Sequence, residues 1–208
     1  MAGYKTQSFN ERKIKMKKFA MMIGFVLAAS VAFAGQFGFE MGTDVNSYDV
    51  SYEQVNTNTY RFKNAPINHS AFEYYVVKSY PGYGITYIKA VSHNIRTNVY
   101  GTAVRSKFET MEDALSRKYG YGKRYDFLMP DSIWDDAKDW MMGILKDERI
   151  LTTIWSDQNG SDIPEDIDTI CLATDAVNRN KGYIVVEYCS KNHEAAQKAS
   201  AAKQNDAF

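Results

Sequence analysis

Histidines are the side chains in this 208-residue chain that titrate near neutral pH, and there are three of them. His69 falls in a polar loop, His93 follows Ser92 at the end of a predicted strand, and His193 lies in the C-terminal tail. We expect a structural or surface role for His93. The sequence contains no Gly-x-Ser-x-Gly, no His-Glu-x-x-His and no phosphate-binding glycine loop. The pattern therefore disfavours an enzyme, although residues from distant segments could still assemble a site.

Two acidic clusters could bind a cation. The segment 157–162 resembles a calcium loop, but its glycine is out of step with the ligand order of an EF-hand. A hairpin turn in which Asn159-Gly160 adopts positive φ is the better interpretation. Asp135, Asp136 and Asp139 fall in the first half of a predicted helix, where they complement its dipole and solvate its outer face. A metal site or an acid–base pair is the alternative there.

The two cysteines, Cys171 and Cys189, lie in β-rich runs separated by the turn signal of residues 178–182. A hairpin centred on Asn180 places Cys171 directly opposite Cys189 and predicts a disulfide between them. Such a bond would close a loop of about 18 residues and stabilise the fold by about 3 kcal/mol. The same pairing puts the more apolar face toward the core; its residues are Ile170, Leu172, Thr174, Ile184, Val186 and Tyr188. Two buried, unpaired thiols are the alternative, and the absence of Cys-x-x-Cys disfavours a redox-active pair.

Tyrosines are crowded around the predicted hairpin of residues 72–92. Alternation places Tyr74 on one face of the first strand and Tyr75 on the other, and one of these faces must be core. We interpret Tyr75, Tyr80, Tyr83 and Tyr87 as a possible binding surface, since tyrosine is enriched at interfaces. Ordinary cross-strand packing is the alternative.

The N-terminal residues 1–34 have the order of a secretory signal peptide. Met16-Lys17-Lys18 is followed by an apolar run to Val31 and by Ala32-Phe33-Ala34, which predicts cleavage between Ala34 and Gly35. Residues 1–15 could be an over-extended start. The apolar run is too short to span a bilayer comfortably, so we expect no stable membrane insertion after cleavage, with an uncleaved anchor as the alternative. The predicted location is periplasmic or secreted.

Removal of residues 1–34 changes the charge of a chain that is neutral as a whole. It leaves 19 basic and 24 acidic side chains, a net charge of −5. Nucleic-acid binding needs a basic surface, so the mature chain is a poor candidate for it. No cofactor is predicted.

The elements that must position these residues form one predicted α+β domain over residues 35–190. Strands are expected in residues 51–63, 72–79, 83–92, 150–156, 167–174 and 183–189, and helices over residues 102–119 and 132–146. The helix over 102–119 carries an apolar stripe and ends at Gly120, while Ser132 is the expected N-cap of the second helix. Irregular alternation of strands and helices predicts an antiparallel sheet with the two helices packed on one face. Residues 191–208 are expected to be a frayed helix or a disordered tail.

The segment Gly38-Phe39-Glu40-Met41-Gly42 and the helix ending in Lys118-Tyr119-Gly120 resemble a group of small, mostly uncharacterised bacterial periplasmic proteins. The resemblance covers residues 36–120. The proline that usually follows Lys-Tyr-Gly is replaced here by Tyr121-Gly122. The resemblance implies an exported α+β module and supplies no catalytic residue.

These observations favour an exported, non-catalytic domain that binds an envelope protein or a glycan through an aromatic-rich sheet or its loops. The alternative is a cell-envelope hydrolase whose carboxylates come from separate segments.

Overall fold

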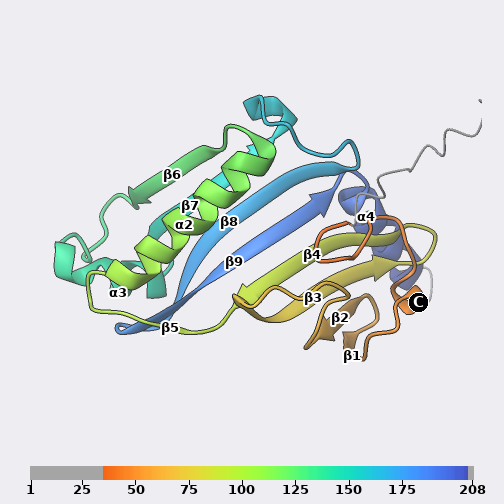
Figure 1. The fold of residues 1–208 in the computed structure, drawn as a ribbon, viewed down its shortest axis with the longest axis horizontal. Helices are drawn as coiled ribbons and strands as arrows, with labels where there is room; N and C mark the ends of the chain where they lie inside the picture. The colour runs from red at the N-terminus through yellow and green to blue at the C-terminus, as the bar shows by residue number, and fades with distance from the viewer. Residues whose placement is uncertain (1–34, 206–208) are drawn as a thin grey trace, which may run out of the picture. The chain divides into compact units, whose positions relative to one another are not determined.

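The computed structural model describes residues 35–205, which form an α+β unit (Figure 1). The predicted signal peptide over residues 1–34 lies outside the described residues, as do residues 206–208. A nine-stranded antiparallel sheet and three α-helices make up the unit. The predicted fold class is therefore confirmed.

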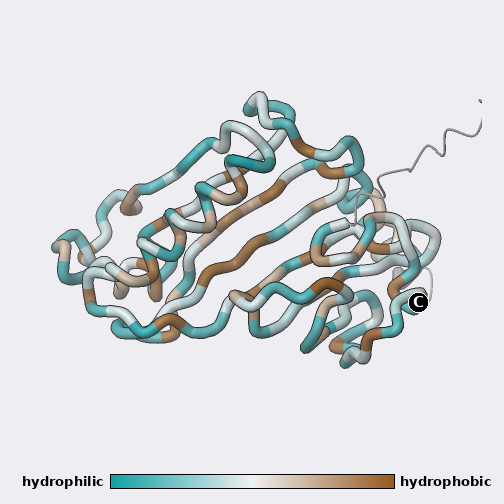
Figure 2. Tube along the Cα trace, in the orientation of Figure 1, coloured by the Kyte–Doolittle hydropathy of each residue, from teal (hydrophilic) through white to brown (hydrophobic). Residues whose placement is uncertain are grey.

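The strands pair in the order β1-β2-β3-β4-β9-β8-β7-β6, and β5 pairs with β9 beyond the end of β4. Their bounds are β1 Tyr52–Asn56, β2 Thr59–Phe62, β3 Phe72–Tyr80, β4 Gly84–Ser92, β5 Ile95–Arg96, β6 Lys123–Leu128, β7 Arg149–Ser156, β8 Ile167–Asn178 and β9 Lys181–Ser190. The long central strands β8 and β9 carry the most apolar residues, which run beneath α2 (Figure 2). The edges of the sheet are formed by β1 and β6, both of which are short and polar.

The helix α2 (Thr102–Tyr119) has the bounds that its periodicity predicts. Its stripe of Val104, Phe108, Met111 and Tyr119 is buried against β8 and β9, and Leu115 packs against the same core. Gly120 ends the helix with φ of 73° and ψ of −148°, a conformation that glycine adopts without steric cost because it has no Cβ.

Two further segments cover the same face of the sheet as α2. The helix α3 (Trp140–Leu145) packs against β7 and β8. At the other end of the sheet, the ring of Phe37 lies 5.0 Å from Tyr75 of β3 and 6.0 Å from Tyr188 of β9, so residues 35–50 close the core over this end. The expectation of two helices on one face is met by α2 and α3.

The helix α3 begins eight residues later than predicted. Ser132 does not cap a helix, because its hydroxyl donates to the carboxylate of Glu148 and accepts from the backbone N–H of Trp134. Asp131 adopts positive φ (64°), and a 3₁₀ turn over Ala137–Asp139 leads into the α-helix. The local capping signal at Ser132 was thus outweighed by a tertiary hydrogen bond.

The predicted register of the β8–β9 hairpin is wrong by two residues. Arg179 and Asn180 form a two-residue turn, and an irregularity at Val177 leaves one residue of β8 unpaired. Cys171 therefore lies opposite Glu187, and Cys189 lies opposite Thr169. Both cysteines are unbonded, so the structure overturns the predicted disulfide.

The remaining expectations have mixed outcomes. The β3–β4 loop spans the three residues 81–83. The edge strand β6 was not predicted, because its polar sequence shows no clear alternation. The tail forms α4 (His193–Asn205), so of the two expectations for this segment the structure favours a helix.

Candidate functional site

The face of the sheet opposite α2 and α3 is the candidate functional surface, and we call it the open face. The strand register shows which side chains point to it, and most of them are partly exposed. The open face consists of Tyr74, Val76 and Lys78 of β3, Tyr87, Lys89 and Val91 of β4, Val185, Glu187 and Cys189 of β9, Thr169, Cys171 and Ala173 of β8, and Thr152 and Ile154 of β7. The described helix that packs on this face is α4, at its β3–β4 end.

The centre of the open face is an ion pair beside two thiols. The Nζ of Lys89 lies 3.0 Å from Oε1 of Glu187, and Cys171 is the cross-strand neighbour of Glu187. Burial raises the pKa of Cys171 to about 11, with a further contribution from the Glu187 charge. Burial also raises the pKa of Cys189. Both thiols are therefore protonated at neutral pH and are poor nucleophiles and poor metal ligands.

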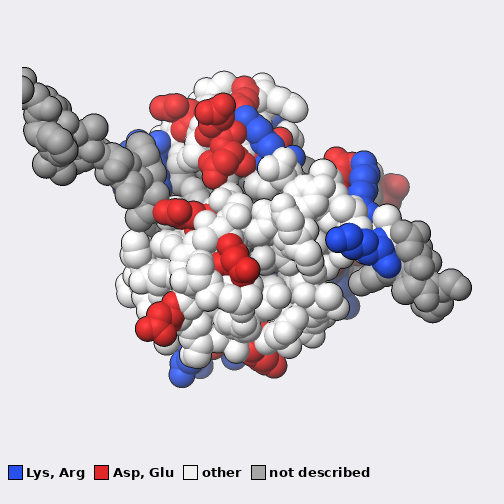
Figure 3. Space-filling model, turned by 90° about the vertical axis from the view of Figure 1, so that its right-hand side faces the viewer, with Lys and Arg blue, Asp and Glu red and all other residues white. Residues whose placement is uncertain are grey.

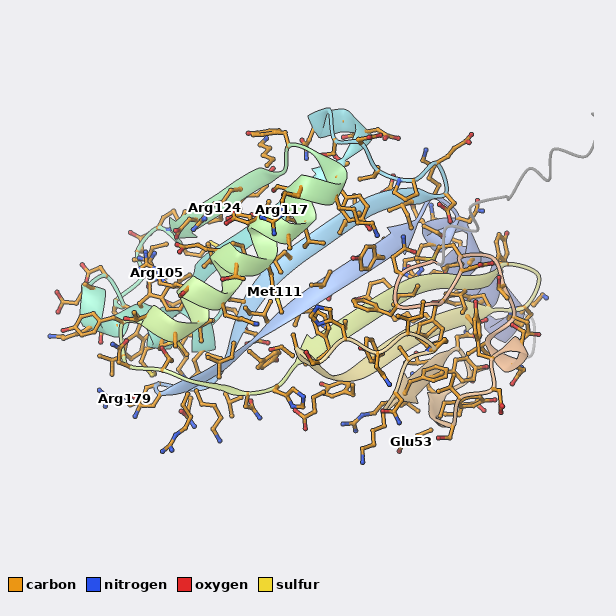
Figure 4. All side chains as sticks on the ribbon, viewed as in Figure 1. Glu53, Arg105, Met111, Arg117, Arg124 and Arg179 are labelled. Carbon is orange, nitrogen blue, oxygen red and sulfur yellow. The ribbon has the colours of Figure 1, made fainter. Side chains whose placement is uncertain are left out.

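The β1–β3 end of the open face contains a shallow pocket of about 440 Å³, which we call the Tyr74 pocket. It is lined by Ser51, Tyr52, Glu53, Arg61, Lys63, Glu73 and Tyr74. The guanidinium carbon of Arg61 lies 4.4 Å from the centroid of the Tyr74 ring, a cation–π contact. Glu53 of β1 lies directly opposite Arg61 of β2 in the strand register. Figure 4 shows Glu53 at the end of the unit away from α2.

The sequence contained part of the signal for this pocket. Alternation along β3 separates Tyr74 from Tyr75, and the structure confirms that the two side chains point to opposite faces. Arg61 was not singled out, because its contact with Tyr74 depends on the pairing of β2 with β3. The sequence of a single strand does not show how that strand aligns with its neighbour.

Three of the four predicted surface tyrosines gather around α4. The His193 ring of α4 stacks on Tyr87, with centroids 5.4 Å apart, and meets the Tyr80 ring edge-on at 6.1 Å. Tyr80 and Tyr83 line a groove of about 220 Å³ together with Pro81, Ala196, Ala199 and Lys203. We call Tyr80, Tyr83 and Tyr87 the aromatic hairpin; its rings pack against the chain's own C-terminal helix.

Tyr75 does not belong to this surface. It is 1% exposed on the core face, where its hydroxyl accepts a hydrogen bond from the N–H of His69 at 3.1 Å. The interpretation of Tyr75 as part of a binding surface is therefore wrong, and the alternative of ordinary packing holds for it. Tyr80 too is largely buried, at 8% exposure.

The carboxylates that come together from separate segments form a structural network. Nη1 of Arg124 in β6 lies 2.7 Å from Oε2 of Glu112 in α2, and the hydroxyl of Thr153 donates to the other Glu112 oxygen. Asp126 forms ion pairs with two arginines: its Oδ2 lies 3.8 Å from Nη2 of Arg124, and its Oδ1 lies 3.5 Å from Nη1 of Arg149. Figure 4 shows Arg124 between β6 and α2. Each carboxylate is engaged by a cation, so this network fastens the edge of the sheet to the helix.

The other acidic segments also have structural roles. Gly160 adopts φ of 77° after a 3₁₀ turn, Asp157 pairs with Lys191 at 3.3 Å, and Asn159 donates to the carbonyl of Ile154. Asn159 itself does not adopt positive φ, and a ten-residue connection replaces the predicted tight hairpin turn. Asp136 forms an exposed ion pair with Lys138. Within residues 35–205 no group of three or more His, Cys, Asp or Glu side chains is placed to bind a metal ion.

Comparisons with known proteins found no matching family model, no matching curated protein and no matching solved structure. None of the helices in the described range combines the length and the apolar character needed to cross a membrane.

Proposed function

We propose that this chain is an exported, non-catalytic binding domain, and that its open face binds a protein of the cell envelope at the Tyr74 pocket. The observation that carries the proposal is the pocket itself, an aromatic and charged hollow at an end of the sheet that none of the described helices covers. Its volume of about 440 Å³ lies within the usual range of small binding sites. The signal-like sequence of residues 1–34 supports an envelope location.

The position of Arg61 favours a protein over a glycan. A sugar ring binds by stacking on the face of an aromatic side chain, and the Arg61 guanidinium already covers one face of Tyr74. Arginine and tyrosine are the residue types that most often dominate protein–protein binding energy. The pocket also offers both signs of charge, from Glu53 and Glu73 and from Arg61 and Lys63, which suits a peptide segment with charged side chains.

The strand beside the pocket strengthens this argument. The pocket is lined by Tyr52 and Glu53 of β1 and by Ser51, which immediately precedes the strand. All five residues of β1 are exposed. As an edge strand of the sheet within residues 35–205, β1 has a row of backbone N–H and C=O groups that do not pair with another described strand. An extended peptide can add to such an edge and direct side chains into a neighbouring pocket.

The test is a saturable binding measurement with the protein isolated from cells. Envelope proteins are titrated against wild type, Tyr74→Ala and Arg61→Ala, with Tyr121→Ala as the matched control because Tyr121 is 69% exposed and lies outside the pocket. We expect each pocket variant to weaken binding about tenfold and the control to bind as wild type. Absence of a saturable protein partner, or equal binding by all four proteins, would contradict the proposal.

A parallel measurement with purified peptidoglycan distinguishes the glycan alternative. Removing the Arg61 side chain uncovers the Tyr74 ring, so a stacked sugar would bind Arg61→Ala as well as or better than wild type. Release of soluble fragments from the peptidoglycan would instead show hydrolysis and contradict the non-catalytic part of the proposal.

A further inference from the structure

The helix α4 is attached to the unit by a narrow stripe of side chains. His193, Ala196, Ala199 and Ser200 are the α4 residues in the stripe, and of these only Ala196 is fully buried. A buried methyl group stabilises by roughly 1 kcal/mol, so the alanines hold the helix weakly. Near its far end one hydrogen bond joins Asn58 to Ser200 at 2.8 Å. Among the described side chains of α4, His193 alone combines a hydrogen bond with contacts to two aromatic rings of the hairpin.

His193 sits in a site built by two strands. Its Nδ1 lies 2.8 Å from the hydroxyl of Thr86, which is 1% exposed, and its ring stacks on Tyr87 with an interplanar angle of 25°. Lys78 of β3 is near the same tyrosine, with Nζ 5.1 Å from the centroid of the Tyr87 ring. A protonated His193 would place a second cation against this ring.

We propose that α4 is a reversible cover of the aromatic hairpin, docked while His193 is neutral and detached when His193 gains a proton. The proposal extends the proposed function, because detachment would enlarge the open face by the Tyr80, Tyr83 and Tyr87 rings. Figure 3 shows that this end of the unit presents a broad area of uncharged side chains, with a few acidic side chains within and around it and Lys and Arg side chains at its margins.

The charges around His193 give the direction of the switch. Burial lowers the pKa of His193, and the Lys78 charge lowers it further. The other groups that face the His193 ring are Tyr80 and Tyr87, which are uncharged. Glu194 on the same helix forms an exposed ion pair with Lys198. Because the docked state favours the neutral ring, docking is strongest above the ordinary pKa of 6.5 and weakens as the pH falls below it.

Hydrogen exchange of the α4 amides tests the proposal without any binding partner. We expect their protection factors, relative to those of β8 and β9, to fall severalfold between about pH 7.5 and about pH 5 in the wild type. In His193→Gln, which retains a hydrogen-bonding group but cannot be protonated, protection should not change with pH, whether α4 is docked or detached. His69→Gln is the matched control and should behave as wild type.

An NMR titration of His193 provides the second measurement. Its pKa should lie below 6.5, and Lys78→Met should raise it because a repelling charge is removed. Equal protection of α4 at both pH values in the wild type, or the same loss of protection in His193→Gln, would overturn the proposal. Neither measurement involves a ligand, so the cover proposal is tested independently of the Tyr74 pocket. Either proposal can be contradicted while the other is supported.

Discussion

Cys171 lies directly opposite Glu187 across β8 and β9, so the two thiols of the chain are offset by two positions along the hairpin. Residues in such a diagonal relation have Cα atoms about 7–8 Å apart, beyond the usual range of a disulfide. An even offset keeps side chains on the same face, so both cysteines still belong to the open face.

The register predicts two free thiols. After denaturation without reductant, alkylation should add two labels per chain, and prior reduction should not change the intact mass. In the folded protein, labelling at neutral pH should be slow, because burial raises the pKa of both thiols. A mass that gains labels only after reduction would show a disulfide and contradict the observed register.

An engineered bond tests the same register. Thr169→Cys places a thiol opposite Cys189, at a separation that a disulfide can span. Mild oxidation should link residue 169 to Cys189 and leave Cys171 free. Peptide mapping of the oxidised protein measures this, and a bond from residue 169 to Cys171 instead would refute the pairing.

Gly101 is predicted to be intolerant of a side chain. A Cβ at this position would lie 2.1 Å from Cε3 of Trp140, and the residue has φ of 68°. We expect Gly101→Ala to lower the free energy of unfolding by about 2–4 kcal/mol, through both overpacking and backbone strain. Gly42→Ala is the control, since Gly42 has φ of 80° but open space around it. Urea unfolding should show that the control loses about 1–2 kcal/mol of unfolding free energy. Equal losses in Gly101→Ala and Gly42→Ala would show that the contact with Trp140 does not contribute.

The Glu112 network should hold β6 against α2. Glu112→Ala leaves the Thr153 hydroxyl without its acceptor and Arg124 with the longer contact to Asp126, which should cost about 1–3 kcal/mol and increase hydrogen exchange in β6. Lys138→Met is the control, because it removes an ion pair whose side chains are both 63% exposed and should leave the unfolding midpoint at that of wild type. If both variants unfold at the same urea concentration as wild type, the network does not stabilise the edge.

Alkaline pH should destabilise the fold. Burial raises the pKa of Tyr87, Tyr183 and Tyr188 above the ordinary value of 10.0. A raised pKa in the folded state means that stability is complete below pH 10 and is lost as the unfolded chain ionises above it. Urea unfolding across this range should show the decline, and Tyr87→Phe should reduce it. An unchanged decline in Tyr87→Phe would show that this hydroxyl does not contribute; Tyr121→Phe, at an exposed site, is the control.

Local patterns predicted the elements that bury a regular stripe. The bounds of α2 and the inward face of the β8–β9 hairpin follow from spacings of three to four and of two residues. The same reasoning failed for β6, whose residues are mostly exposed on both faces, and for the start of α3, where Glu148 engages Ser132 from 16 residues away. The candidate functional surface was only partly predictable for the same reason: the sequence could assign Tyr74 to a face, but it could not show the contact of Tyr74 with Arg61.

The sequence by itself determined the class of this fold, the helix α2, the inward face of the β8–β9 hairpin, and the signal-like pattern of residues 1–34. These properties depend on periodicity and composition, which are local. The tertiary structure alone decided that Cys171 faces Glu187, that Arg61 covers Tyr74, and that His193 brings α4 onto the aromatic hairpin. Those relationships depend on one unpaired residue in β8, on the pairing of β2 with β3, and on the docking of a helix. Each of these contacts joins residues that are distant in the sequence, and hydrophobic periodicity within one segment carries no information about such contacts.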